Sequence, residues 1–185
     1  MPGYVLGASP ETEEARLLRL ARSGDGAAFE ALLRAHEVTV ARTALRLLGN
    51  RQDAQDAAQE VFFRLHRNLG RIDGAGNLSG WLYRVAVNVC RDILRKRRNM
   101  TPLDDSRLPA QGSAETEMGR GEQRRLVLAA LQSLPEKERA ALTLRDLEGL
   151  PTAQVASLLG SSEATVRSQI SSARLKIRKM LGRRS

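Results

Sequence analysis

Residues 151–180 of the chain read PTAQVASLLGSSEATVRSQISSARLKIRKM, and this stretch decides the fold. It predicts two helices, 152–159 and 162–181, with Thr152 as the N-cap of the first and Gly160 as the turn between them. The small Ala156 lets the two helices cross closely. This spacing is typical of a helix-turn-helix, whose second helix enters the major groove of DNA. We therefore expect the C-terminal part of the chain to bind DNA.

The second helix of this unit, 162–181, has two different faces. Apolar residues recur at helical spacing and should face the core, namely Val166, Ile170, Ala173, Ile177 and Leu181. The polar side chains beside that face are the candidate contacts to DNA, namely Arg167, Ser168, Gln169, Ser171, Arg174 and Arg178. Arginine suits guanine edges or phosphates, glutamine suits adenine, and serine suits either. The alternative is a helical hairpin with a solvated, arginine-rich face, but the place of the stripe on the second helix favours DNA.

The rest of the chain also has the composition of a helical protein. Apolar residues make up 42% of the chain and aromatic residues only 3%, so its cores must consist of Leu, Val, Ile and Ala. Apolar and polar residues never alternate over a useful length, and the sequence therefore predicts an all-α protein. Besides the two helices above, we expect helices at 13–21, 27–48, 53–69, 81–98, 124–133 and 136–146. We expect a loop at 70–80, which contains four glycines.

The distribution of charge divides the chain into parts. Residues 25–99 carry a net charge of +5, residues 100–123 carry −3, and residues 124–185 carry +7. The acidic stretch 101–122 contains prolines and glycines and has little periodicity. We therefore expect two small helical domains, 13–100 and 123–185, joined by a flexible acidic linker. Basic blocks attract polyanions by releasing condensed counterions, which makes nucleic acid the first partner to consider.

Several classes of protein can be set aside. No segment has the sustained apolar length of a membrane-spanning helix, and the N-terminus lacks a signal peptide, so we expect a cytoplasmic protein without membrane insertion. The lone Cys90 excludes an internal disulfide and a cysteine-based zinc site, and we expect it in the core, with redox sensing as the alternative. His36 and His66 stand apart from any catalytic arrangement. We expect no catalytic site, no metal and no cofactor.

The helix expected at 81–98 repeats the division into an apolar and a basic face. Its polar positions are Arg84, Asn88, Arg91, Arg95 and Lys96, and Trp81 stands at its start beside the glycine-rich loop. An aromatic side chain beside a basic helix can stack on an exposed base, as in proteins that bind single strands. A place in the core suits Trp81 equally well.

The helix expected at 53–69 carries acidic and amide side chains opposite its apolar face. These side chains are Asp53, Asp56, Gln59 and Glu60. An acidic face seldom suits DNA, because it repels phosphates. The face is therefore either solvated or a surface on which another protein docks.

These segments together resemble a known family. Residues 45–62, followed by WLYRVAVN at 81–88 and DILRKRR at 92–98, closely resemble region 2 of bacterial extracytoplasmic function (ECF) sigma factors. Residues 134–178 resemble region 4 of the same family. The two motifs occur in the right order, and the resemblance extends over residues 24–181. The sequence departs from the family in the helix expected at 162–181, where it has Arg167-Ser168-Gln169 and family members commonly have Lys-Ser-Arg.

The resemblance implies a role for each segment. Residues 53–68, with Asp53, Asp56, Gln59 and Glu60, would dock on the clamp helices of the RNA polymerase β′ subunit. Residues 70–80 would capture a base flipped out of the −10 element, and helix 81–98 would read and melt that element. Residues 162–178 would read the −35 element. The acidic linker is similar to the segment that threads the RNA exit channel of the polymerase.

The resemblance also implies the partners. They would be core RNA polymerase, through β′ and the β subunit, promoter DNA, and an anti-sigma factor that holds the two domains. The protein would then be a specificity subunit of the polymerase and not an enzyme by itself. The alternative class is a conventional helix-turn-helix regulator with an N-terminal sensory or dimerisation domain. Such a regulator would bind palindromic duplex DNA without polymerase, and it does not explain the acidic helix or the second basic helix.

Overall fold

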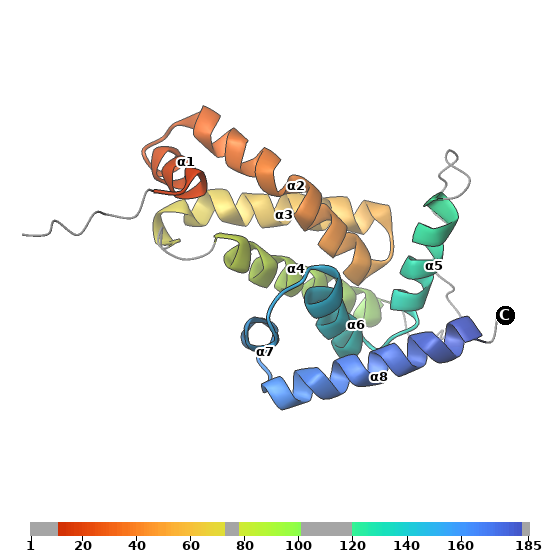
Figure 1. The fold of residues 1–185 in the computed structure, drawn as a ribbon. Helices are drawn as coiled ribbons and strands as arrows, with labels where there is room; N and C mark the ends of the chain where they lie inside the picture. The colour runs from red at the N-terminus through yellow and green to blue at the C-terminus, as the bar shows by residue number, and fades with distance from the viewer. Residues whose placement is uncertain (1–10, 73–77, 101–119, 183–185) are drawn as a thin grey trace, which may run out of the picture.

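The computed structural model describes residues 11–72, 78–100 and 120–182, and this part of the chain is helical without any strand (Figure 1). The prediction of an all-α fold is confirmed. The N-terminal helices are α1 (Glu13–Arg22), α2 (Gly26–Leu48), α3 (Arg51–Asn68), a short 3₁₀ turn η1 (Leu69–Arg71) and α4 (Leu78–Met100). The C-terminal helices are α5 (Arg120–Gln132), α6 (Glu136–Leu142), a π-helical turn η2 (Thr143–Leu147), α7 (Thr152–Leu159) and α8 (Glu163–Gly182).

Local capping explains where the long N-terminal helices begin and end. The side chain of Asp25 accepts hydrogen bonds from the backbone N–H groups of Ala27 and Ala28, at 2.9 and 3.1 Å, and so starts α2. Gly49 ends α2 in the left-handed conformation, with φ of +80°. Asn50 then caps α3 by accepting from the backbone N–H of Asp53 at 2.8 Å. The break between the two helices therefore lies at Gly49 and Asn50, as the sequence predicts.

The core of the N-terminal half consists of aliphatic side chains from α2, α3 and α4. Leu32, Val61, Leu65, Leu82 and Val87 are all buried. Burial of each such side chain contributes about 1.5–3 kcal/mol. The expectation of a core without many aromatic residues is therefore confirmed.

Cys90 lies in this core, as expected. Its thiol is buried, and burial raises the pKa of the thiol to about 12. A thiolate is the reactive form of cysteine, so the fold keeps Cys90 unreactive near neutral pH. This supports its interpretation as a small apolar core residue.

Three expectations about local structure are wrong. Helix α4 begins at Leu78, and η1 covers Leu69–Arg71, so parts of the loop expected at 70–80 are helical, while residues 73–77 lie outside the described residues. The reason is the burial of Leu78, which outweighs the nearby glycines. The helix expected at 136–146 changes from α-helical to π-helical geometry after Leu142.

The third correction concerns Thr152. Pro151, with φ of −58° and ψ of 144°, is the N-cap of α7, and Thr152 is the first residue inside the helix. The ring of proline fixes φ at a value that suits the entry into a helix, and Pro151 has no side-chain acceptor, so α7 starts without a side-chain cap. The Thr152 hydroxyl is therefore available for another contact, and it accepts a hydrogen bond from Nε of Arg145 at 3.3 Å.

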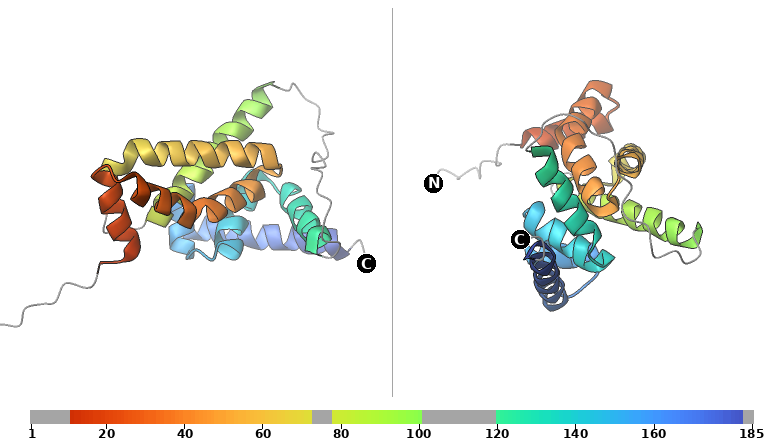
Figure 2. Two further views of the ribbon diagram at one scale, coloured as in Figure 1. Left: turned by 90° about the horizontal axis from the view of Figure 1, so that it is seen from above. Right: turned by 90° about the vertical axis from the view of Figure 1, so that its right-hand side faces the viewer.

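The two groups of helices lie against each other, with α5, α6 and α7 in contact with α2 or α4 (Figures 1 and 2). Glu148, which follows η2, is the centre of this contact, and its side chain is only 1% exposed. Its carboxylate pairs with Arg42 at 3.2 Å and with Arg46 at 2.5 Å, and it accepts a hydrogen bond from the hydroxyl of Tyr83 at 3.3 Å. We call this contact the Glu148 seam. The side chain of Gln132 adds a hydrogen bond to the backbone oxygen of Arg46, at 2.9 Å.

Candidate nucleic-acid interface

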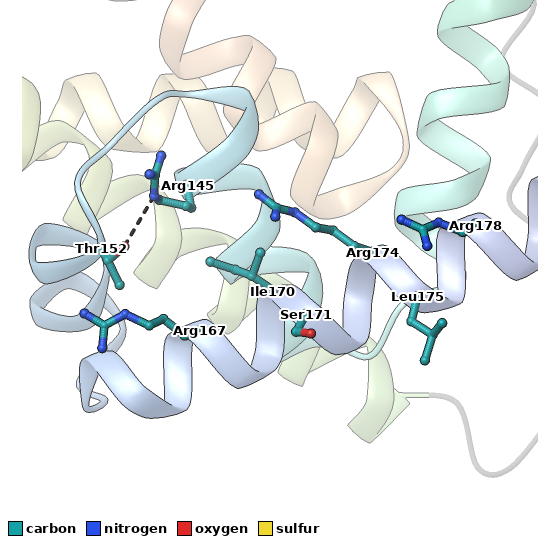
Figure 3. Close-up of a pocket in the computed structure, with 8 residues that line it drawn as sticks. All are labelled: Arg145, Thr152, Arg167, Ile170, Ser171, Arg174, Leu175 and Arg178. Carbon is teal, nitrogen blue, oxygen red and sulfur yellow. Dashed lines mark hydrogen bonds between the residues drawn. The ribbon is translucent and has the colours of Figure 1, made fainter.

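A basic groove of about 490 Å³ lies where η2, α7 and α8 meet (Figure 3). Four arginines from two different elements surround it. Its lining residues are Arg145, Thr152, Arg167, Ile170, Ser171, Arg174, Leu175 and Arg178. We call this site the arginine groove.

The helix-turn-helix explains how α8 presents its side of the groove. Gly160 takes the left-handed conformation, with φ of +63°, and lets the chain turn between α7 and α8. Ser162 caps α8 by accepting from the backbone N–H of Thr165 at 3.1 Å. Val166 and Ala173 are fully buried and fix the rotation of α8. Successive turns of the helix then place four of the predicted residues on the groove, namely Arg167, Ser171, Arg174 and Arg178.

Two predicted residues of α8 do not line the groove. Ser168 is exposed beside it, whereas Gln169 is half-buried, and its Oε1 atom is buried without a hydrogen-bond partner. On the same side of α8, Ser172 and Lys176 bind Glu138 of α6, at 3.0 and 2.7 Å. Residues that follow one another in 167–171 therefore lie on different sides of α8, and only some of them line the groove.

Arg145 and Thr152 belong to the groove, although the sequence does not predict them. Arg145 comes from η2, and its Nε donates to Thr152 at the start of α7. No local motif marks Arg145, because a regular α-helix over 136–146 would not predict which of its side chains reach α8. It is the packing of α6 against α8, together with the contacts of η2 with α6 and α7, that places Arg145 at the groove.

Two of the groove arginines are held by carboxylates. Nε and Nη2 of Arg174 donate to the two carboxylate oxygens of Asp146, at 2.8 Å each, and these hydrogen bonds raise the pKa of Arg174. Nη2 of Arg167 donates to Glu163, one turn earlier on the same helix, at 2.6 Å. Both arginine side chains remain exposed, so each can still contact a ligand.

The predicted polar stripe of α4 is only partly free. Asn88, Arg95 and Lys96 are exposed, and Arg91 is half-buried close to α6. Arg84 is exposed but donates to the hydroxyl of Ser157 on α7 at 3.3 Å. Trp81 is half-buried and packs against the core, which supports the core interpretation for much of its ring.

The predicted polar face of α3 divides in two. Asp56 and Gln59 are exposed, and Glu60 pairs with Arg64 at 2.7 Å. Asp53 has a structural role, because its carboxylate binds the Asn50 cap at 3.1 Å and pairs with Arg97 of α4. The structure therefore groups Asp56, Gln59 and Glu60 and sets Asp53 apart.

Phe63 joins this face of α3, although the sequence analysis does not single it out. Its side chain is 56% exposed, and the guanidinium carbon of Arg67 lies 5.6 Å from the centre of its ring. The signal in the sequence is the pair Phe62-Phe63, because adjacent residues of a helix point in different directions and the next core position after Val61 and Phe62 at helical spacing is Leu65, not Phe63. Phe62 packs against the core, and Phe63 points away from it.

Comparison with known families identifies this arrangement. The family model of sigma-70 region 2 matches residues 32–100, and that of sigma-70 region 4 matches residues 124–177. The chain is 34% identical to the ECF RNA polymerase sigma factor SigM of Mycobacterium tuberculosis (strain ATCC 25618 / H37Rv), over 98% of this chain and 91% of that protein. This chain belongs to the ECF sigma factors. It binds RNA polymerase and directs transcription from promoters that its regions 2 and 4 recognise.

Other comparisons agree with this assignment. The ECF sigma-E factor of Escherichia coli (strain K12) is 31% identical, over 85% of this chain and 88% of that protein. Among solved structures, that of CnrH in complex with the cytosolic domain of CnrY superposes with a TM-score of 0.72 at 26% identity, covering 94% of this sigma factor and all of that chain. The resemblance inferred from the sequence is therefore confirmed. Across the described residues of the sigma factor, no helix has both the length and the apolar character that crossing a membrane requires.

Proposed function

We propose that this sigma factor contacts its promoter at two places, with the arginine groove at the −35 element and the polar stripe of α4 at the −10 element, while α3 docks on core RNA polymerase. The arginine groove is the observation that carries the proposal. Four guanidinium groups from two elements line it, and only Arg167 and Arg174 pair with carboxylates within the described residues, so the groove keeps an excess of positive charge that suits a polyanion.

The groove residues suit different parts of the DNA. Arg167, Ser171 and Arg174 lie along the half of α8 that enters the major groove in helix-turn-helix proteins, and they suit base edges. Arg145, from a different element, and Arg178, further along α8, suit phosphates. Ser168 stays in the proposed set beside Arg167. Gln169 would need a new rotamer to reach a base, because its Oε1 is buried.

The α4 stripe suits a single strand of the −10 element. Arg84, Arg91, Arg95 and Lys96 supply positive charge to its backbone, and Asn88 supplies hydrogen bonds to an unstacked base. The exposed edge of Trp81 would support such a base. Melting costs a few kcal/mol for each unstacked step, and capture of the extruded strand offsets this cost.

The exposed face of α3 suits a protein surface that carries positive charge and an apolar pocket. Asp56, Gln59 and Glu60 provide charge and hydrogen bonds, and Phe63 provides an aromatic anchor. We assign this face to the polymerase β′ clamp helices, with region 4 meeting the β subunit. We keep Asp53 in the proposed set as the residue that fixes the start of α3.

The remaining partners follow from the family. The solved structure that superposes on this chain holds CnrH in complex with a second protein, the cytosolic domain of CnrY, and we propose that an anti-sigma factor binds this chain between its two halves. We propose a cytoplasmic location, where polymerase and promoter are found, and a regulatory role without catalytic activity, metal or cofactor of its own.

The groove assignment can be tested by neutralising its outer arginines. Holoenzyme that carries Arg145→Ala and Arg178→Ala should bind a −35 duplex more weakly at every salt concentration. A plot of the logarithm of the binding constant against the logarithm of the salt concentration has a negative slope. This slope should become less steep by about 0.9 for each lost phosphate contact. The control is the double variant Arg16→Ala and Arg34→Ala, which removes the same two charges from exposed positions of α1 and α2. Unchanged binding and slope in the groove variant would overturn the assignment.

A further inference from the structure

The π-helical turn η2 directs two neighbouring residues toward the arginine groove. The backbone N–H of Glu148 donates to the carbonyl of Thr143 at 3.0 Å, which is the wider i to i+5 spacing of a π-helix. Arg145 lines the groove, and Asp146 binds Arg174 across the gap between η2 and α8. Single π-turns inside helices occur often at functional sites.

The bond between Asp146 and Arg174 leaves one edge of the guanidinium free. Arginine has five N–H donors in a planar fork. Asp146 accepts from Nε and from Nη2, both at 2.8 Å, and so occupies the side edge of the group. The end edge, formed by Nη1 and the second hydrogen of Nη2, remains available. That edge can make a bidentate contact to O6 and N7 of guanine.

The neighbouring arginines provide a contrast. Arg167 pairs with Glu163 of its own helix, at the spacing of an ordinary surface pair. Arg178 lines the same groove, and no ion pair of Arg178 is found within the described residues. Arg174 is thus the groove arginine whose carboxylate partner comes from a different element and binds through two hydrogen bonds.

We propose that Asp146 is a positioning residue for promoter recognition, because it holds the Arg174 guanidinium with its free edge toward the DNA. This inference rests on the proposed function of the groove. The carboxylate also repels phosphates, so it lowers the affinity for DNA of any sequence. At the same time it increases the discrimination between bases at the position that Arg174 contacts. Asp146 therefore acts on the sequence discrimination of the −35 contact more than on its strength.

The test measures discrimination with holoenzyme and a set of −35 duplexes in which each base pair is replaced in turn. Arg174→Ala should abolish the preference at one position, where the unmodified protein discriminates by roughly 10- to 100-fold. Asp146→Ala should reduce the preference at that same position several-fold, and its affinity for unrelated DNA should stay equal or rise. Asp146→Asn, which keeps the shape but has one acceptor oxygen, should show the same loss to a smaller extent.

Glu163→Ala is the matched control, because Glu163 is the carboxylate partner of Arg167 and its loss removes the same negative charge as Asp146→Ala. It should leave the position that depends on Arg174 unchanged. If Arg174→Ala changes one position but both Asp146 variants keep full discrimination there, the positioning role is wrong while the groove assignment stands. If Arg174→Ala changes no position, the DNA contact of Arg174 fails and the positioning role fails with it.

Discussion

Asp56 and Asp53 of α3 differ in their suitability for testing the proposed docking surface. Asp56 is exposed and accepts a hydrogen bond from Gln52, one turn earlier, at 3.2 Å. No contact to a more distant part of the described chain holds Asp56, so a change at this residue leaves the core intact. The neighbouring Asp53 is different, because its carboxylate accepts a hydrogen bond from the side chain of Asn50, the N-cap of α3, and pairs with Arg97. Asp56 is therefore the cleaner probe of docking.

We predict that Asp56→Arg lowers the affinity of the sigma factor for core RNA polymerase by roughly tenfold or more. The new positive charge would face the positive charge proposed for the polymerase surface. Binding can be measured by titration of labelled sigma factor with core polymerase. Glu30→Arg, an exposed change of the same kind on α2, is the control and should bind normally. Equal affinities for the two variants would remove α3 from the docking surface.

The helices themselves follow from short-range signals in the sequence. Asp25, Gly49 and Asn50 fix the ends of α2 and the start of α3, and apolar spacing fixes the buried faces. The stripe of α8 was predictable for the same reason. The signals were misleading where packing decided the outcome, as at Leu78, whose burial extends α4 into an apparent loop.

The parts of the site that could not be predicted depend on contacts between elements. Arg145 reaches the groove because η2 is a π-turn, and Thr152 accepts its hydrogen bond because Pro151 already starts α7. The buried Oε1 of Gln169 likewise reflects the packing of α8. Such contacts join residues of different elements, and the periodicity within one helix does not predict them.

Burial on the helices indicates which side chains contribute most to the free energy of unfolding. We predict that Leu65→Ala, in the fully buried face of α3, lowers the free energy of unfolding by about 2–5 kcal/mol, because it leaves a cavity. Leu181 was expected to face the core, but it lies near the end of α8 and is 45% exposed, so Leu181→Ala should change the free energy of unfolding much less. Denaturant unfolding followed by circular dichroism gives both values. Similar losses for the two variants would show that α3 does not form the core described.

At the scale of the whole molecule, the Glu148 seam lies where the two groups of helices meet. In this arrangement the proposed −10 surface lies against the helix-turn-helix, since Arg84 of α4 donates to Ser157 of α7 at 3.3 Å. The two promoter elements lie about 25 base pairs apart, which is roughly 85 Å along the helix axis at about 3.4 Å per base pair. The halves must therefore separate before both surfaces can bind one promoter.

We predict that Glu148→Ala shifts the free protein toward a separated arrangement by roughly tenfold or more, because it removes the buried partner of Arg42 and Arg46. Energy transfer between labels on α2 and α8 measures the separation. Glu30→Ala is the control, since Glu30 is an exposed residue of α2. A distance that is unchanged in Glu148→Ala would show that other contacts hold the seam.

Tyr83 makes the same seam sensitive to alkaline pH. Burial and the neighbouring carboxylate of Glu148 raise the pKa of Tyr83 from 10.0 to about 12. A pKa that is raised on folding gives stability that is complete below pH 10 and is lost as the pH rises through about 12. The label distance should therefore increase over this range, and Tyr83→Phe should remove that dependence. A Tyr83→Phe variant that opens over the same range would assign the change to another group.

The two-point contact with the promoter is the central claim, and tethered DNA cleavage in the promoter-bound holoenzyme tests it most directly. A cleaving reagent is attached at Ser171→Cys on α8 or at Asn88→Cys on α4, each in a Cys90→Ala background. We predict cleavage within the −35 element from α8 and cleavage within the −10 element from α4, both only when core polymerase is present. Cleavage of the same element from both positions, or the same pattern without polymerase, would contradict the claim.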